Sequence, residues 1–119
     1  MFHNITDPIY RTGYDRNYWI WEKPEEGVPY ILVADVARGD GSDFSCFHVV
    51  RVDTMTVVAE YQGKPDLDMY SNILFSAGTE YGTCLLVVEN NGIGIAVLEK
   101  LKDMGYKKNI LLHQVDSRA

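Results

Sequence analysis

Residues 31–52 read ILVADVARGDGSDFSCFHVVRV, and this stretch decides the fold. An apolar run ends in an acid, Asp35, and a turn rich in glycine and aspartate follows it. A second strand pattern then continues to Val52. A tight turn favours Gly and Asp, but it gives no reason for the last residue of a buried strand to be an acid. The position of Asp35 therefore suggests a functional carboxylate.

Strand patterns lie on both sides of this turn. Residues 29–35 are almost continuously apolar, as in a central strand that is covered on both faces. Residues 44–52 alternate between two faces, and residues 55–63 return as a third strand. These three predict an antiparallel meander. Ahead of them, YWIWEKP (18–24) predicts a further strand that turns at PEEG and leads directly into residues 29–35.

Beyond the meander the apolar period changes to that of helices. One helix is predicted from a 3, 4, 3, 4 spacing, with Pro65 and Asp66 at its start and Gly82 after its end; the spaced residues are Leu67, Tyr70, Leu74, Ala77 and Tyr81. A short buried strand, CLLVVE, ends on Glu89. A second helix follows, with Gly105 at its C′ position and a buried face of Ile93, Val97, Leu101 and Met104. KNILLH predicts a last strand.

This order predicts an α/β fold in which a mixed sheet, an antiparallel three-stranded meander plus parallel crossover strands, is flanked by helices. With 119 residues the chain suits one domain. We expect residues 1–17 to be a lead-in or linker and residues 18–119 to be the domain. Apolar runs such as ILVA and LLVV are too short to span a membrane. Cys46 and Cys84 have no metal-ligand spacing and are expected to be reduced core residues in a reducing compartment.

Asp35 and Glu89 share one feature, because each is the final residue of an apolar strand. Strands joined by helical crossovers usually lie parallel, so we expect both acids to emerge side by side at one edge of the sheet, where ligands of open α/β sheets bind. Two converging carboxylates repel one another unless a cation or a proton intervenes. Mg²⁺ or Mn²⁺ suits such oxygen ligands, and a carboxylate-bridged pair of ions can promote phosphodiester hydrolysis. Either acid alone would be an ordinary turn or cap residue.

Neighbouring residues offer weaker candidates. Asp43 either adds an oxygen ligand or only forms the turn, and Asp40 suits the turn better. Arg38 either contacts a phosphate or balances the acids around it. Asn90 and Asn91 stand at a helix start, where they can cap the helix or bind a DNA phosphate.

Two further observations limit the function. His48 falls on the face of Phe44 and Val50, which favours a packed sheet histidine over a ligand. The net charge of −6 argues against a nucleic-acid binder with a broad basic face. It does not exclude an enzyme whose acidic site is neutralised by divalent cations.

In YILVADVARGDGSDFSCFHVV followed by LLVVENNGIGIAVLEKL, the chain resembles the nuclease domain of the large terminase subunit of tailed bacteriophages, especially of the T-even-like myophage type. The first family motif, a strand that ends in Asp before a Gly-rich hairpin, matches Asp35 with Asp43 in the loop. The second, a strand that ends in Glu before a polar helix start, matches Glu89 with Asn90 and Asn91. The resemblance runs from about Tyr18 to the end of the chain.

The resemblance implies a ribonuclease H-like fold and a Mg²⁺- or Mn²⁺-dependent endonuclease that cuts concatemeric viral DNA during packaging. Asp35, Glu89 and Asp43 would be the metal ligands, and the complete domain would hold two ions. The implied partners are double-stranded viral DNA, an upstream ATPase domain, the portal and the small terminase subunit, all in the host cytoplasm.

The sequence departs from the family in two ways. The ATPase motor domain has no counterpart, and neither does the third metal-binding Asp, because Asp116 follows the last strand too closely. The resemblance therefore implies a domain truncated at its C-terminus, with weak metal binding and little or no cutting by this chain alone. The alternatives are another ribonuclease H-like nuclease of the resolvase, transposase or RNA–DNA hybrid type, a sugar-kinase or actin-like ATPase lobe, or a non-catalytic assembly module. The ATPase lobe would need a second Gly-rich hairpin, which the sequence lacks.

Overall fold

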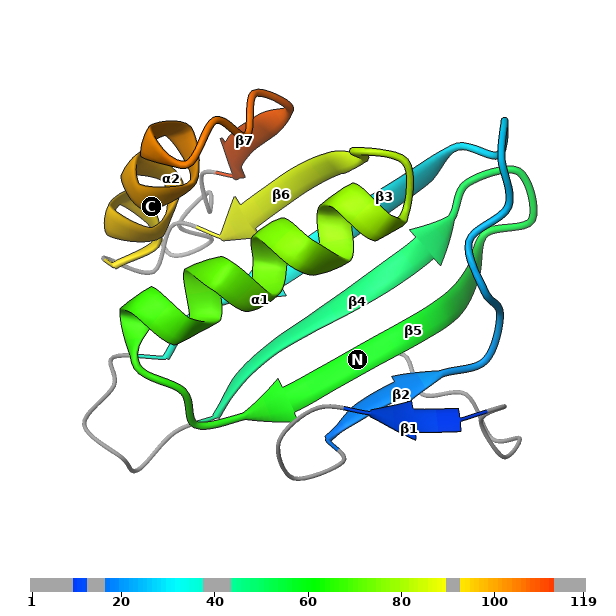
Figure 1. Ribbon diagram of the computed structural model, residues 1–119, viewed down its shortest axis with the longest axis horizontal. Helices are drawn as coiled ribbons and strands as arrows, with labels where there is room; N and C mark the ends of the chain where they lie inside the picture. Colours follow the sequence, from blue (N-terminus) through cyan, green and yellow to red (C-terminus); the bar gives the residue numbers. More distant parts are fainter. Residues whose placement is uncertain (1–9, 13–16, 38–43, 90–92, 113–119) are drawn as a thin grey trace, which may run out of the picture.

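The computed structural model of the 119-residue chain describes residues 10–12, 17–37, 44–89 and 93–112 (Figure 1). The elements follow in the order β1 (Tyr10–Thr12), β2 (Tyr18–Ile20), β3 (Tyr30–Asp35), β4 (Ser45–Arg51), β5 (Thr56–Gly63), α1 (Leu67–Glu80), β6 (Leu85–Glu89), α2 (Gly94–Asp103) and β7 (Asn109–Leu112). None of the helices in these residues is long and apolar enough to cross a membrane.

All the described strands form one mixed sheet in the order β1-β2-β5-β4-β3-β6-β7. β3, β4 and β5 are the antiparallel meander, while β6 pairs in parallel with β3 and with β7. The predicted α/β arrangement, an antiparallel meander plus parallel crossover strands flanked by helices, is confirmed. β5, β3, β6 and β7 all run the same way, so two successive right-handed crossovers place α1 and α2 on one face of the sheet. Figure 1 shows α1 crossing in front of the central strands, with α2 beside it next to β6 and β7.

The core lies between the sheet and the helices. Alternate strand residues point to the helices and are fully buried, among them Leu32, Ala34, Phe47, Val49, Leu86 and Val88. From the helices, Tyr70, Leu74, Val97 and Leu101 complete this layer. The start of α1 is also as predicted, because the side chain of Asp66 accepts a 2.8 Å hydrogen bond from the amide of Met69 as the N-cap.

The expected partner of β2 was wrong. Residues 18–24 were predicted to turn directly into the strand that is now β3, but β2 ends at Ile20 and pairs with β5 instead, with Tyr18 opposite Tyr61. The reason is that β4 and β6 occupy both sides of β3. The chain after β2 is held beside β5 by the amide of Trp21, which donates to the carbonyl of Val58 at 2.8 Å.

The predicted burial of Met104 was also wrong. α2 ends at Asp103, which leaves Met104 as the C-cap with 36% of its surface exposed. Gly105, with φ of 94°, reverses the chain as predicted, and the amide of Tyr106 then donates to the carbonyl of Leu101. Tyr106, 2% exposed, is the residue of this segment that lies in the core, and Met104 is not.

Candidate metal centre at the sheet edge

Asp35 and Glu89 end two neighbouring parallel strands. β3 and β6 pair in register from Ile31 with Leu85 to Ala34 with Val88, and one further step along both strands brings Asp35 level with Glu89. Adjacent strands lie about 4.8 Å apart. The structure therefore brings the two acids together at one edge of the sheet, which we call the acidic edge.

Both carboxylates point away from the helices. Ala34 and Val88, the residues before them, are fully buried under α1 and α2, so the alternation of side chains turns Asp35 and Glu89 to the other face. Asp35 is exposed and Glu89 is half-buried. This placement leaves the pair accessible to a cation and to a substrate.

Cys46 lies next to this pair, directly opposite Asp35 on β4. The pKa of its thiol is raised to about 11, first by burial and then by the negative charges of Asp35, Glu60 and Glu89 in that order. Two of these carboxylates are the strand-end acids. Their charges converge on the acidic edge, and a bound cation would offset them.

Tyr70 of α1 fixes the backbone beneath the site. Its buried hydroxyl has one proton to donate, which lies between the carbonyl oxygen of Cys46 at 2.7 Å and that of Asp35 at 3.1 Å. Burial, with smaller contributions from Cys46 and Asp35, raises the pKa of Tyr70 well above its usual value, so the phenol remains a donor. Helical spacing predicted that Tyr70 would be buried, but no sequence signal indicated the role of its hydroxyl.

Gly94 brings α2 close to Glu89. A side chain on Gly94 would collide with the carbonyl oxygen of Glu89 and would approach Val88 Cγ1 to 3.2 Å. The N-cap of α2 is Ile93, whose side chain makes no capping bond. The first turn of α2 therefore rests directly on the end of β6.

His48 and Glu60 form a second polar pair on the same face, one row further from the edge. His48 is paired with Val33 and Glu60 with His48, and the two side chains make a 2.9 Å contact between Nε2 and Oε1. Both are largely buried. This agrees with the expectation of a sheet histidine rather than a metal ligand.

The other predicted site residues, Arg38, Asp40, Asp43, Asn90 and Asn91, lie outside the described residues. In the part of the chain that the structure describes, no group of three or more His, Cys, Asp or Glu side chains is arranged to hold a metal ion. The described donor set is thus two carboxylates. This set fits Mg²⁺, which proteins commonly bind through one or two carboxylates, with water and substrate phosphate as the remaining ligands.

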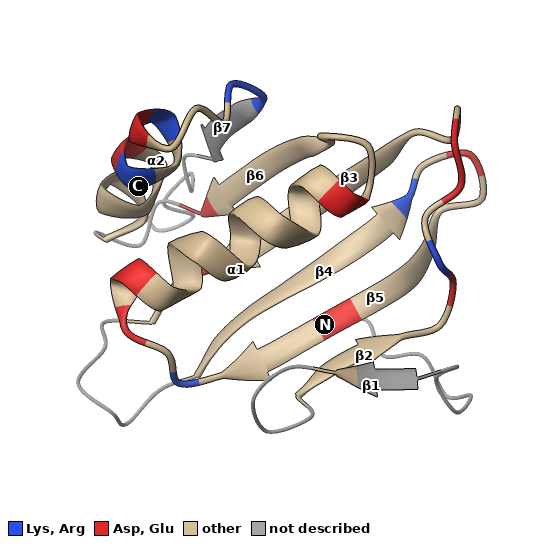
Figure 2. Ribbon diagram, viewed as in Figure 1, with Lys and Arg blue, Asp and Glu red and all other residues tan. Residues whose placement is uncertain are grey.

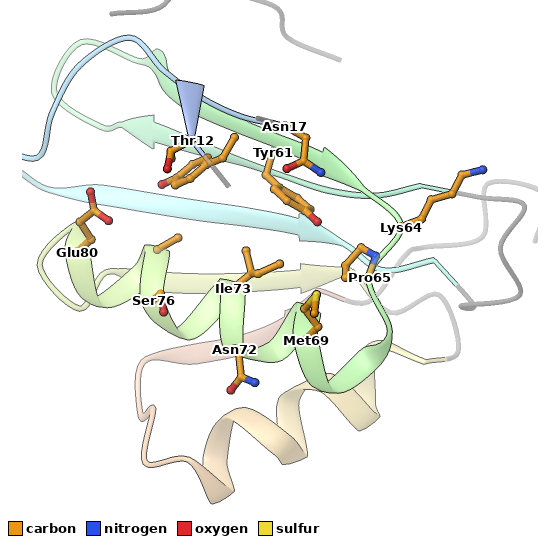
Figure 3. Close-up of a pocket in the computed structure, with 12 residues that line it drawn as sticks. Thr12, Asn17, Tyr61, Lys64, Pro65, Met69, Asn72, Ile73, Ser76 and Glu80 are labelled. Carbon is orange, nitrogen blue, oxygen red and sulfur yellow. The ribbon is translucent and has the colours of Figure 1, made fainter. Parts of the chain in front are cut away.

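A separate pocket of about 680 Å³ lies between α1 and the strands β1, β2 and β5 (Figure 3). Met69, Ile73 and Ala77 line it along α1, and Tyr18 and Tyr61 form the opposite wall. These tyrosines point to the helix face of the sheet, whereas the acids point to the other face. The pocket is mainly apolar and does not include the acidic pair.

The fold of this chain is similar to that of several solved structures. No family model and no curated protein matches the sequence. The large terminase nuclease of thermophilic phage G20c matches with a TM-score of 0.76 and 22% identity over 91% of this chain and 55% of that one. Its structure with bound magnesium matches with a TM-score of 0.79 and 23% identity over 96% and 58%. The large terminase nuclease domain of Thermus phage P74-26 matches with a TM-score of 0.75 and 22% identity over 96% and 56%.

These matches establish the fold, because the structural agreement extends over nearly the whole chain while sequence identity is low. The G20c nuclease has also been crystallised with cobalt and with zinc. This chain spans somewhat more than half the length of the domains that it matches.

Proposed function

We propose that this chain is the metal-dependent endonuclease domain of a phage DNA-packaging terminase, which hydrolyses phosphodiester bonds of concatemeric double-stranded viral DNA. The observation that supports this most strongly is the pairing of Asp35 with Glu89 at the ends of adjacent parallel strands. The same fold occurs in terminase nucleases, one of which binds magnesium in a solved structure.

In this proposal Asp35 and Glu89 hold Mg²⁺ or Mn²⁺, with Asp43 as a further oxygen donor and two ions in the complete domain. When bound, the divalent cation supplies positive charge that lowers the pKa of water and offsets the charge of the phosphate. Tyr70 keeps the end of β3 in place, and Gly94 allows α2 to support the end of β6. Arg38, Asn90 and Asn91 would contact the DNA backbone.

Residues 18–119 would be the nuclease domain, acting in the host cytoplasm with an ATPase domain, the portal and the small terminase subunit. We also expect weak metal binding and little or no cutting by this chain alone.

Thermal unfolding with and without millimolar Mn²⁺ tests the metal site. A cation that binds the folded chain raises the unfolding midpoint by mass action, and Asp35→Asn or Glu89→Gln should each remove that increase. Asp103→Asn, which removes an exposed acid at the far end of α2, is the matched control and should keep it. If Mn²⁺ stabilises the wild type and both site variants equally, the metal site is refuted and a non-catalytic assembly module becomes the better reading.

A plasmid-nicking assay with Mn²⁺ tests the activity. We expect slow or undetectable nicking by the chain alone, and any nicking should disappear in Asp35→Asn. Robust cleavage that depends on Asp35 would support the proposed nuclease function. It would contradict our expectation that the chain alone cuts little or no DNA. Cleavage that survives in both Asp35→Asn and Glu89→Gln would place the chemistry elsewhere.

A further inference from the structure

Phe44 and Lys64 lie side by side at the acidic edge. Ser45 at the start of β4 pairs with Gly63 at the end of β5, so the residues just beyond this pair are neighbours. The ammonium of Lys64 lies 4.7 Å from the centroid of the Phe44 ring, within the range of a cation–π contact. Phe44 is nevertheless 52% exposed, so its ring is accessible to a ligand.

This pair lies near the two acids. β5 and β3 both run antiparallel to β4, so both end at the acidic edge. In the strand order, β4 alone separates β5 from β3. The end of β5 is therefore two strand spacings, or about 10 Å, from the end of β3. Lys64 and Phe44 can thus contact a chain that crosses Asp35 and Glu89.

Lys64 is distinctive among the described basic side chains. Figure 2 shows a basic segment after the end of β5 and acidic segments at the start of α1. Lys64 directly follows β5, and Asp66 and Asp68 lie at the N-cap and in the first turn of α1. Lys100 pairs with Asp68. The remaining lysine and arginine side chains that the structure describes lie at the opposite edge or at the end of α2: Lys23, Arg51, Lys102, Lys107 and Lys108. By position, Lys64 directly follows a strand that ends at the acidic edge, where its charge can attract an anion.

A cation next to an exposed aromatic ring matches the repeating chemistry of a polynucleotide. An ammonium group binds a backbone phosphate without regard to sequence, and an aromatic ring stacks on a base. In a duplex both faces of each base are covered by its neighbours, so stacking on Phe44 requires an unpaired base.

We propose that Phe44 and Lys64 form a subsite for the DNA strand beside the scissile bond, in which Lys64 binds a backbone phosphate and Phe44 stacks on an unpaired base. The subsite rests on the proposed nuclease function and adds a substrate feature, local strand separation next to the cut. It also gives the acidic edge a means of holding DNA despite its own negative charge.

Fluorescence anisotropy with labelled single-stranded and duplex DNA of one sequence tests the subsite. EDTA is present throughout, so metal binding plays no part. Lys64→Ala should weaken binding to both DNAs and lower the salt slope by about 0.9 for the duplex and about 0.7 for the single strand. Phe44→Ala should weaken single-strand binding about fivefold or more, as expected for the loss of one stacked base, and leave duplex binding unchanged. Phe44→Trp should retain single-strand binding.

Lys107→Ala and Met55→Ala, at the opposite edge, are the matched controls. Neither should change the affinity for single-stranded or duplex DNA. Equal thermal midpoints of all variants would show that they are folded. The subsite is overturned if Lys64→Ala behaves like Lys107→Ala, if Phe44→Ala weakens both DNAs equally, or if the wild type binds neither DNA at low salt. Should these variants behave as expected while Asp35→Asn leaves the Mn²⁺ response intact, the DNA subsite stands and the proposed metal chemistry fails.

Discussion

Cys46 reports on the charge that Asp35 and Glu89 bring to the acidic edge. Its thiol is half-buried, and its pKa is raised to about 11 by burial and then by Asp35, Glu60 and Glu89. The folded chain therefore holds this proton more tightly than the unfolded chain. The contribution of Cys46 to stability is present below pH 9.0, the ordinary value, and falls as the pH rises towards 11.

Replacing Asp35 by Asn should make Cys46 more reactive. Removing one negative charge lowers the pKa of the thiol, and the thiolate is the form that reacts with iodoacetamide. At pH 9, each half-unit decrease in pKa increases the thiolate fraction about threefold. The rate of alkylation in EDTA, measured in a Cys84→Ser background, tests this. Asp103→Asn removes the same charge at a distant position and is the control. An unchanged alkylation rate in Asp35→Asn would show that this carboxylate does not influence the thiol.

At the scale of single residues, the sequence predicted that Asp35 and Glu89 end neighbouring strands. It did not predict which side chains contact or lie beside them. Asp35 and Glu89 could be found because each breaks an apolar run at its last residue, a local feature. The link from the Tyr70 hydroxyl to Asp35, and the contact of Lys64 with Phe44, depend on strand register and helix placement. Register depends on the whole sheet rather than on any short segment. Two sets of predicted roles stay predictions: catalysis and metal binding by Asp35 and Glu89, with Asp43 as a further ligand, and DNA contact by Arg38, Asn90 and Asn91.

Among the elements, α1 packs unusually close to its neighbours at Gly78. A β-carbon at this position would lie 2.5 Å from the hydroxyl oxygen of Tyr106 and 3.0 Å from Leu86 Cδ2. Tyr106 cannot simply turn away, because its hydroxyl donates to the carbonyl of Cys84 and its ring packs on Phe75. Gly78 is therefore a packing requirement of the contact between α1, β6 and the chain after α2.

We expect Gly78→Ala to lower the free energy of unfolding by about 1–3 kcal/mol through overpacking. The change goes against helix propensity, which favours Ala over Gly by about 1 kcal/mol. Urea unfolding measures the effect, with Asn72→Ala as the control at an exposed position of the same helix, where little loss is expected. Adding Tyr106→Phe should reduce the cost of Gly78→Ala, since the closest atom is then absent. A stabilising Gly78→Ala would contradict this packing argument.

The elements themselves were largely predictable, and their partners were not. The helical period located α1, and the turn at Gly105 was identified from its position after α2. Periodicity gives the type of an element and its buried face, but it cannot show that β2 crosses the meander to pair with β5. It also placed Met104 in the core. The helical period alone does not show that α2 ends at Asp103 and that Tyr106, beyond the turn, is the buried residue.

For the whole molecule, the two faces of the sheet have different roles. α1 and α2 share one face with most of the core, while Asp35, Glu89, His48 and Glu60 point to the other. The parallel pairing of β3 with β6 joins the two roles, since the same strands carry the core residues and the acids. The position of the site therefore depends on the most buried part of the sheet.

Hydrogen exchange should reveal this arrangement. β3 lies at the centre between β4 and β6, and its Leu32 and Ala34 are fully buried, whereas the three-residue β1 pairs with β2 alone in the described sheet. Amides that open only with the whole fold exchange slowest. We therefore expect residues 31–35 and 86–88 to show the slowest exchange by mass spectrometry and residues 10–12 the fastest of the described strands. If β3 exchanged as fast as β1, its end could not hold Asp35 beside Glu89 as a fixed pair, and the metal site would need another support.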